Sequence, residues 1–179
     1  KRVKKRLVFA GSAVGFRADT VRLPNGKKAG REFLFHPGAV AVLPILPDGS
    51  VIMVRQYRYP VGAVTLEIPA GKLHSFRDGR LKRAAAELRE ETGYTAAKLV
   101  PLLSFWPTPA FSNELLDIYL AEGLKPGRSC PDDDEFIRTE RLPFEKALRL
   151  VKTGRIKDAK TVIALQAYAL LRSPRRGVK

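Results

Sequence analysis

The sequence predicts a domain of the α/β (α+β) class, with strands filling its first half and helices concentrated after residue 80. Two dipeptides that favour tight β-turns, Asn25-Gly26 and Asp48-Gly49, each separate strand-like segments. Residues 80–92 contain neither Gly nor Pro and carry apolar residues at helical spacing. The 179 residues suit one domain, and they contain no internal repeat or low-complexity linker.

The expected strands are short apolar runs rich in β-branched residues. The Asp48-Gly49 turn lies between two of these runs, and Pro69 is expected to end the next one. The predicted strands are residues 39–43, 51–54, 64–68, 98–105 and 115–121.

The clearest helix covers residues 80–92, where we expect Asp78 to cap the start and Gly93 to end the helix. Residues 143–152 and 158–171 are predicted as two further helices, separated by Gly154. In the first helix, apolar positions at i, i+3, i+4 and i+7 predict one buried stripe, made of Leu81, Ala84, Ala85 and Leu88.

The formal net charge of +15 is the unusual feature of the composition. Clustered cations attract phosphate, so the charge suits either a nucleic-acid partner or the attraction of anionic nucleotides towards a cleft. The basic residues gather at the two ends of the chain, and no aromatic-basic platform accompanies them, so a nucleic-acid partner is not favoured.

Neither a membrane-spanning segment nor a disulfide bond is expected from the sequence. No apolar run is long enough to cross a bilayer, so no membrane partner is expected. A lone Cys130 excludes an intramolecular disulfide and a cysteine metal cluster, and it fits a reducing, cytoplasmic location.

The predicted helix at residues 80–92 carries an acidic face opposite its apolar stripe. Glu87 and Glu91 are like charges one turn apart, and with Glu90 they lie near the helix C-terminus, where the dipole disfavours anions. By itself this pattern also fits a solvated acidic patch beside arginines. A divalent cation would remove both penalties, because magnesium prefers hard oxygen ligands.

The segment from Gly71 to Tyr94 resembles the Nudix box, which favours the metal interpretation. The box runs Gly, five residues, Glu, seven residues, Arg-Glu-hydrophobic-x-Glu-Glu-x-Gly-hydrophobic. The second half of this pattern is Ala86-Glu87-Leu88-Arg89-Glu90-Glu91-Thr92-Gly93-Tyr94, which matches at every fixed position except the arginine.

Two departures from the box alter its expected details. One extra residue precedes the helix, so the first box glutamate falls at Asp78. Ala86 stands where the family has an arginine that braces a metal-binding glutamate, and we hypothesise that Arg83 supplies this brace from one turn earlier.

Segments outside the box resemble the ADP-ribose pyrophosphatase and nucleoside diphosphate sugar hydrolase branch of the family. Arg58, in Arg55-Gln56-Tyr57-Arg58, matches an arginine that contacts substrate there, although a plain strand-end cation is the alternative. Pro109 lies fifteen residues after Tyr94, close to the proline of that branch. Glu67, before the box, and Glu114, in Ser112-Asn113-Glu114, are further expected substrate-binding residues.

An acidic loop at residues 131–137 resembles the loop that carries a general base and an additional metal ligand in this branch. Counting back from Ile137 gives the base role to Asp133 and the ligand role to Glu135. Asp134 and the box glutamates, Glu90 among them, compete for the base role because the Asp133 side chain is short.

The resemblance implies a Nudix fold, a mixed β-sheet sandwiched between helices, with an N-terminal antiparallel strand region. The implied reaction is hydrolysis of ADP-ribose to AMP and ribose 5-phosphate with Mg²⁺, which Mn²⁺ could replace. The implied metal ligands are the Ala70 carbonyl, Glu87, Glu90, Glu91 and Glu135, with Gly71, Gly93 and Arg83 in support.

Relatives in this branch are homodimers that share their N-terminal strands. The resemblance therefore implies a dimerisation part at residues 1–35 and a hydrolase domain at residues 36–179. Three alternative functions stay open: hydrolysis of GDP-mannose or another sugar nucleotide, hydrolysis of dinucleoside polyphosphates or RNA caps, and nucleotide or RNA binding with little catalysis.

Overall fold

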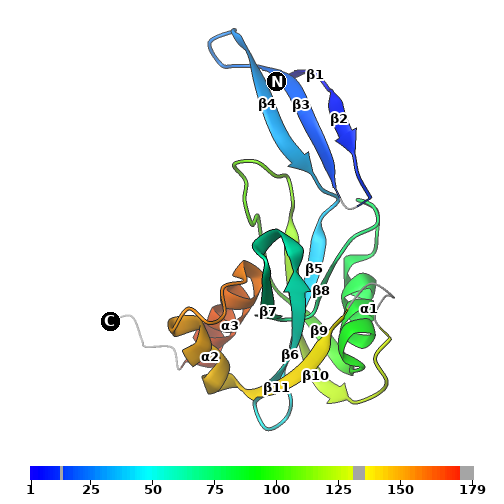
Figure 1. Ribbon diagram of the computed structural model, residues 1–179, viewed down its shortest axis with the longest axis vertical. Helices are drawn as coiled ribbons and strands as arrows, with labels where there is room; N and C mark the ends of the chain where they lie inside the picture. Colours follow the sequence, from blue (N-terminus) through cyan, green and yellow to red (C-terminus); the bar gives the residue numbers. More distant parts are fainter. Residues whose placement is uncertain (13, 131–135, 174–179) are drawn as a thin grey trace.

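The computed structural model describes residues 1–12, 14–130 and 136–173. It confirms the α+β class, because three sheets are combined with the three α-helices α1 (Arg80–Thr92), α2 (Phe144–Lys152) and α3 (Ala159–Arg172). In Figure 1, α1 lies on one side of the strands of the main body, and α2 and α3 lie on the other side. Among the described residues, no helix is both long and apolar enough to span a membrane.

The N-terminal strands form a separate antiparallel sheet that projects from the body (Figure 1). Its central strand pairs with two short strands along one side and with one long strand along the other, across the Asn25-Gly26 turn. The four strands are β1 (Arg2–Lys4), β2 (Leu7–Ala10), β3 (Gly15–Arg22) and β4 (Lys28–Phe35).

Two further sheets make up the body. The first has the order β8 (Ala70–Lys72), β5 (Ala39–Pro44), β10 (Leu116–Lys125) and β9 (Thr95–Phe105), and it is mixed because β5 and β10 run parallel. The second has the order β11 (Arg138–Pro143), β6 (Ser50–Arg58) and β7 (Ala63–Glu67), with the 3-10 turn η1 (Tyr59–Val61) joining β6 to β7.

Strand β5 lies at the centre of the core, and every residue in it is buried. Its alternate side chains enter two clusters: Val40 and Val42 pack with Ala84 and Leu88 of α1, while Leu43 packs in the cluster that includes α3. A strand covered on both faces has a continuous apolar sequence rather than an alternating one. The helices on both faces of β5 therefore explain the continuous apolar run that predicted this strand.

Helix α1 has the predicted bounds, but its start and its buried face differ from the expectation. Gly79, not Asp78, occupies the N-cap. The Asp78 carboxylate instead accepts hydrogen bonds from the His74 and Ser75 N–H groups at 2.6 and 3.0 Å, so the preceding loop takes the acceptor that a cap needs. At the other end, Gly93 has φ 78° and caps the helix as predicted.

The predicted apolar stripe of α1 is correct for Ala84 and Leu88 and wrong for Leu81 and Ala85, which are exposed. The helix is rotated about its axis so that Glu87 and Glu91 are buried beside Ala84 and Leu88, with 4% and 3% exposure. Packing on β5 decides this rotation, which brings part of the acidic face into the protein.

Helix α3 begins at a side-chain cap that joins it to the body. Asp158 accepts hydrogen bonds from the Thr161 N–H at 3.0 Å and from the Thr161 hydroxyl at 2.6 Å. The same Thr161 oxygen accepts a hydrogen bond from the Ile68 N–H at 2.9 Å, just after β7 ends. The first turn of α3 is thereby fixed against the end of β7.

Candidate functional site

The box residues Gly71 and Glu87 are in close contact. A Cβ atom built on Gly71 would lie 1.5 Å from Glu87 Oε1, so only glycine leaves room for this carboxylate above β8. On the helix side, the Arg83 Nη2 atom lies 2.5 Å from Glu87 Oε1, and Arg83 Nη1 lies 3.3 Å from Glu90 Oε2. Glu87 therefore occupies a narrow slot between strand and helix.

Glu91 lies against the same strand one turn further along α1. Its Oε2 atom accepts a hydrogen bond from the Ala70 N–H at 3.2 Å. Glu90, in contrast, is only partly buried. The structure thus brings Ala70, Gly71, Glu87 and Glu91 together, and their role at a metal stays a prediction.

Gly93 also has a packing role in addition to its helix cap. A Cβ atom at this position would lie 2.5 Å from the Gly127 carbonyl oxygen, and its positive φ disfavours other residues. Gly93 therefore allows the segment that precedes residue 131 to pass close to the end of α1.

The donor set at α1 fits a hard divalent cation. Two buried carboxylates supply oxygen atoms, and the Gly71 cradle leaves room for one of them beside the strand. Magnesium binds through few protein oxygens and takes its other ligands from water and phosphate. Within the described part of the chain, no group of three or more His, Cys, Asp or Glu side chains is arranged so that it could hold a metal ion. The predicted ligand Glu135, the predicted general base Asp133 and its alternative Asp134 lie outside the described residues.

A second polar cluster surrounds Glu67 at the end of β7. Arg58 donates two hydrogen bonds to this carboxylate, from Nε at 2.9 Å and from Nη2 at 2.7 Å. Thr65 Oγ1 donates a third at 2.6 Å, and the Lys160 ammonium group also binds Glu67. Burial raises the pKa of Glu67, but hydrogen bonds from Arg58 and the charge of Lys160 outweigh it and lower the pKa to about 2.

The Glu67 cluster lies between two clefts. One, of about 290 Å³, is lined by Arg58, Lys160, Ala70 and Gly71, so it joins the cationic cluster to the strand beside Glu87 and Glu91. The other, of about 740 Å³, is lined by Arg58 and Lys160 together with residues of β7 and the start of α3. Arg58, Lys72 and Lys160 line the smaller cleft, and its Ala70–Gly71 wall is the strand that Glu87 and Glu91 contact. This arrangement suits a ligand that carries phosphate.

His36 and Glu114 line the smaller cleft at the end near the N-terminal sheet. The Gly38 N–H donates to His36 Nδ1 at 3.0 Å, and Glu114 Oε1 lies 3.9 Å from the same nitrogen. Burial lowers the pKa of His36, although Glu114 opposes this effect. The Nδ1 atom of His36 is therefore placed as a hydrogen-bond acceptor.

Two of the four predicted substrate-binding residues line the smaller cleft, and two do not. Arg58 and Glu114 line it, whereas Glu67 is only 1% exposed and is engaged by its three partners. Pro109 is exposed in a turn, and it is Pro107 that lines the cleft. The substrate contacts assigned to Glu67 and Pro109 stay predictions.

Three further residues that the sequence pattern did not indicate line the cleft: Lys160, His36 and Lys72. For Lys160 a signal was present, because it follows the helix-capping Asp158 within a segment that resembles the closing helices of the family branch. Its contact with Glu67, 93 residues away, depends on how α3 meets β7.

The chain is similar to known proteins over most of its length. The NUDIX domain family model matches residues 35–165 of the chain. A protein of Bacillus methanolicus named methanol dehydrogenase activator is 43% identical over 95% of this chain and 92% of its own length. ADP-ribose pyrophosphatase of Bacillus subtilis (strain 168) is 41% identical over the same shares.

More distant similarities extend the comparison. GDP-mannose pyrophosphatase of Yersinia enterocolitica is 31% identical over 72% of this chain and 71% of its own length. A crystal structure of an ADP compounds hydrolase aligns with a TM-score of 0.81 over 96% of this chain and 92% of that chain, at 21% sequence identity. At that identity the likeness concerns the fold, which matches from the N-terminal sheet to α3.

Proposed function

Since the chain belongs to the NUDIX domain family, we propose that it hydrolyses the diphosphate bond of ADP-ribose to give AMP and ribose 5-phosphate. It is a Nudix pyrophosphohydrolase of the nucleoside diphosphate sugar class. The observation that carries the proposal is the smaller cleft. It is lined by Arg58 and Lys160 and by Ala70 and Gly71, the strand residues that Glu87 and Glu91 of α1 contact. Support for ADP-ribose comes from the relative of that name, which is similar over 95% of this chain.

Enzymes of this family require a divalent metal, and we propose Mg²⁺, with Mn²⁺ as a substitute. The proposed ligands are Glu87, Glu90, Glu91, the Ala70 carbonyl and Glu135. The bound metal would neutralise the diphosphate and lower the pKa of the attacking water. The position of the two buried carboxylates supports this assignment, because both lie against the Ala70–Gly71 strand and supply the hard oxygen atoms that magnesium prefers.

The remaining steps belong to side chains of the chain itself. Arg58 and Lys160 bind the diphosphate, and their link through Glu67 fixes their positions before substrate arrives. Asp133 accepts the proton of the attacking water, with Asp134 and Glu90 as alternative bases. Glu114 and the turn at Pro109 contact the part of the substrate nearest the N-terminal sheet.

The test is an assay of nucleoside monophosphate release from ADP-ribose, GDP-mannose and diadenosine polyphosphates. Each substrate is assayed with Mg²⁺, with Mn²⁺ and with a chelator, and Glu91→Gln serves as the inactive control. We expect ADP-ribose to have the highest kcat/KM and the chelator to abolish release. A higher kcat/KM for GDP-mannose or for a dinucleoside polyphosphate would refute the substrate assignment.

A second candidate function is activation of a dehydrogenase. It is favoured by the relative named methanol dehydrogenase activator, which is 43% identical over 95% of this chain. The rate of methanol oxidation by a methanol dehydrogenase, measured with and without this chain, tests the candidate. Activation that the Glu91→Gln variant also gives would show that it does not need hydrolysis.

We also propose that the chain forms a cytoplasmic homodimer through residues 1–35. Several apolar side chains of β1 and β2 support this, because Val3, Leu7, Val8 and Phe9 are 46%, 56%, 53% and 63% exposed. Within the described residues, β1 and β2 pair only with β3, which leaves their outer edges open. A monomeric mass by light scattering at assay concentration would refute the dimer.

A further inference from the structure

The box position that carries an arginine in the family is Ala86 in this chain, and the structure places another guanidinium beside the same glutamate. Arg83 lies one helical turn before Glu87, and its Nη2 atom is 2.5 Å from Glu87 Oε1. Its Nη1 atom is 3.3 Å from Glu90 Oε2. One guanidinium therefore spans two of the proposed metal ligands.

The two sides of Glu87 leave its carboxylate little freedom. On the strand side, the backbone of Gly71 is so close that a Cβ atom there would lie 1.5 Å from Glu87 Oε1. On the helix side, the Arg83 side chain is 22% exposed and the Glu87 side chain 6% exposed, so the ion pair is largely shielded from water. A guanidinium holds its nitrogen atoms in a fixed plane, so one group can meet both Glu87 and Glu90 at set positions, as the two contacts of Arg83 do.

Helix stability does not explain why an arginine occupies position 83. A cation in the first turn of a helix opposes the helix dipole. An ion pair at i, i+4 is also weaker when the cation precedes the anion, as it does for Arg83 and Glu87. The position is favoured by its contact with the glutamates rather than by the helix itself.

We propose that Arg83 is the positioning residue that replaces the missing box arginine and holds Glu87 in the orientation that binds the metal. This inference rests on the proposed metal-dependent hydrolase function. A positioning residue and a simple counter-ion predict opposite changes in Mg²⁺ affinity when Arg83 is removed. Loss of a brace weakens metal binding, whereas loss of a competing positive charge strengthens it.

The experiment compares Arg83→Ala, Arg83→Lys and the relocation variant Arg83→Ala/Ala86→Arg with the wild type. Arg89→Ala is the matched control, because Arg89 lies on the exposed side of the same helix. The Mg²⁺ dissociation constant is measured by calorimetry without substrate, and kcat and KM are measured separately by AMP release. Circular dichroism establishes that each variant is folded.

We expect Arg83→Ala to weaken Mg²⁺ binding by about 10- to 100-fold, the range found when a group that orients a metal ligand is removed. Most of the accompanying loss of activity should appear in kcat. Arg83→Lys should recover part of the affinity, and the relocation variant should recover most of it by restoring the arginine at position 86. Arg89→Ala should match the wild type.

Unchanged or tighter Mg²⁺ binding in Arg83→Ala would overturn the inference, and so would a relocation variant no better than Arg83→Ala. If the relocation variant fails to fold, the affinities of Arg83→Ala and Arg83→Lys still show whether loss of the guanidinium weakens or strengthens Mg²⁺ binding. Failure of the proposed function would appear differently, as a wild-type chain that releases no monophosphate from any substrate. The Mg²⁺ titration without substrate would still report on Arg83 in that case.

Discussion

Replacing Glu67 by Gln removes a buried negative charge to which Arg58 and Lys160 both bind. The Glu67 side chain is 2% exposed, and glutamine keeps its shape while it loses the charge. Two cations are then left close together at the cleft. We expect the variant to be less stable than the wild type at pH 7 and to lose a defined part of the pH dependence of stability.

The pKa of Glu67 sets the size of this effect. The pKa is lowered from 4.5 to about 2, and this difference corresponds to about 3 kcal/mol of folding free energy. Because the folded-state pKa is depressed, the contribution is fully present above about pH 5 and is lost as the pH falls towards 2. By pH 3, about 2 kcal/mol of it should be gone.

Urea unfolding followed by circular dichroism at pH 7, 5 and 3 measures the effect. Between pH 7 and pH 3 the wild type should lose about 2 kcal/mol more unfolding free energy than Glu67→Gln. Glu145→Gln is the control, because that side chain is 70% exposed and lies 4.0 Å from Arg172. If Glu67→Gln loses as much stability as the wild type over this range, the hydrogen bonds and charges around Glu67 do not lower its pKa as described.

Three further predictions concern the cleft and its surroundings. Gly71→Ala should lower AMP release about 100-fold without loss of fold, because its Cβ would lie 1.5 Å from a carboxylate oxygen of α1. Gly30→Ala, whose Cβ meets nothing within 4 Å, should leave the rate unchanged, and equal rates for the two variants would contradict the steric argument. Lys160→Met should raise KM about 10-fold with a smaller change in kcat, since it removes a cation that binds ground state and transition state alike; an unchanged KM would remove Lys160 from the substrate site. Finally, kcat/KM for anionic substrates should fall as ionic strength rises, and Lys4→Gln/Lys5→Gln should flatten this dependence.

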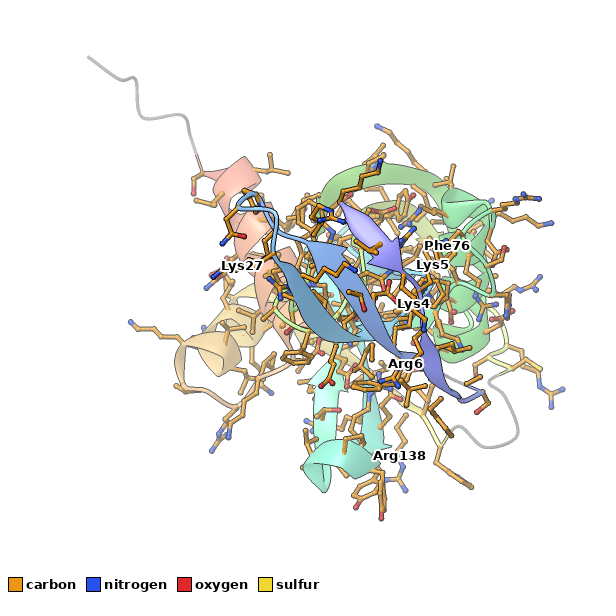
Figure 2. All side chains as sticks on the ribbon, turned by 90° about the horizontal axis from the view of Figure 1, so that it is seen from above. Lys4, Lys5, Arg6, Lys27, Phe76 and Arg138 are labelled. Carbon is orange, nitrogen blue, oxygen red and sulfur yellow. The ribbon has the colours of Figure 1, made fainter. Side chains whose placement is uncertain are left out.

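The last prediction follows from the distribution of charge in the N-terminal sheet. Residues 1–35 hold ten lysines and arginines against two acids, and nine of the ten are exposed. Figure 2 shows Lys4, Lys5 and Arg6 along the β1–β2 side of the sheet and Lys27 at the turn between β3 and β4. A salt response that is identical in Lys4→Gln/Lys5→Gln and in the wild type would show that these charges do not attract substrate.

The sequence by itself determined the features that depend on local pattern. The Asp48-Gly49 turn, the buried strand β5 and the bounds of α1 follow from turn chemistry, apolar runs and the absence of helix breakers. The run from Glu87 to Tyr94, with Gly71 before it, was sufficient to indicate the family, because these positions have local roles in strand, turn or helix.

The tertiary structure decided which side chains meet across the chain. The rotation of α1 on β5 buries Glu87 and leaves Leu81 exposed, and a helical period cannot specify that rotation because neighbouring faces differ by only a fraction of a turn. The ion pair between Lys160 and Glu67 joins residues 93 positions apart, and it forms because Thr161 fixes the first turn of α3 to the end of β7. No local pattern in the sequence predicts that contact, because it depends on how α3 and β7, two elements far apart in the chain, pack against each other.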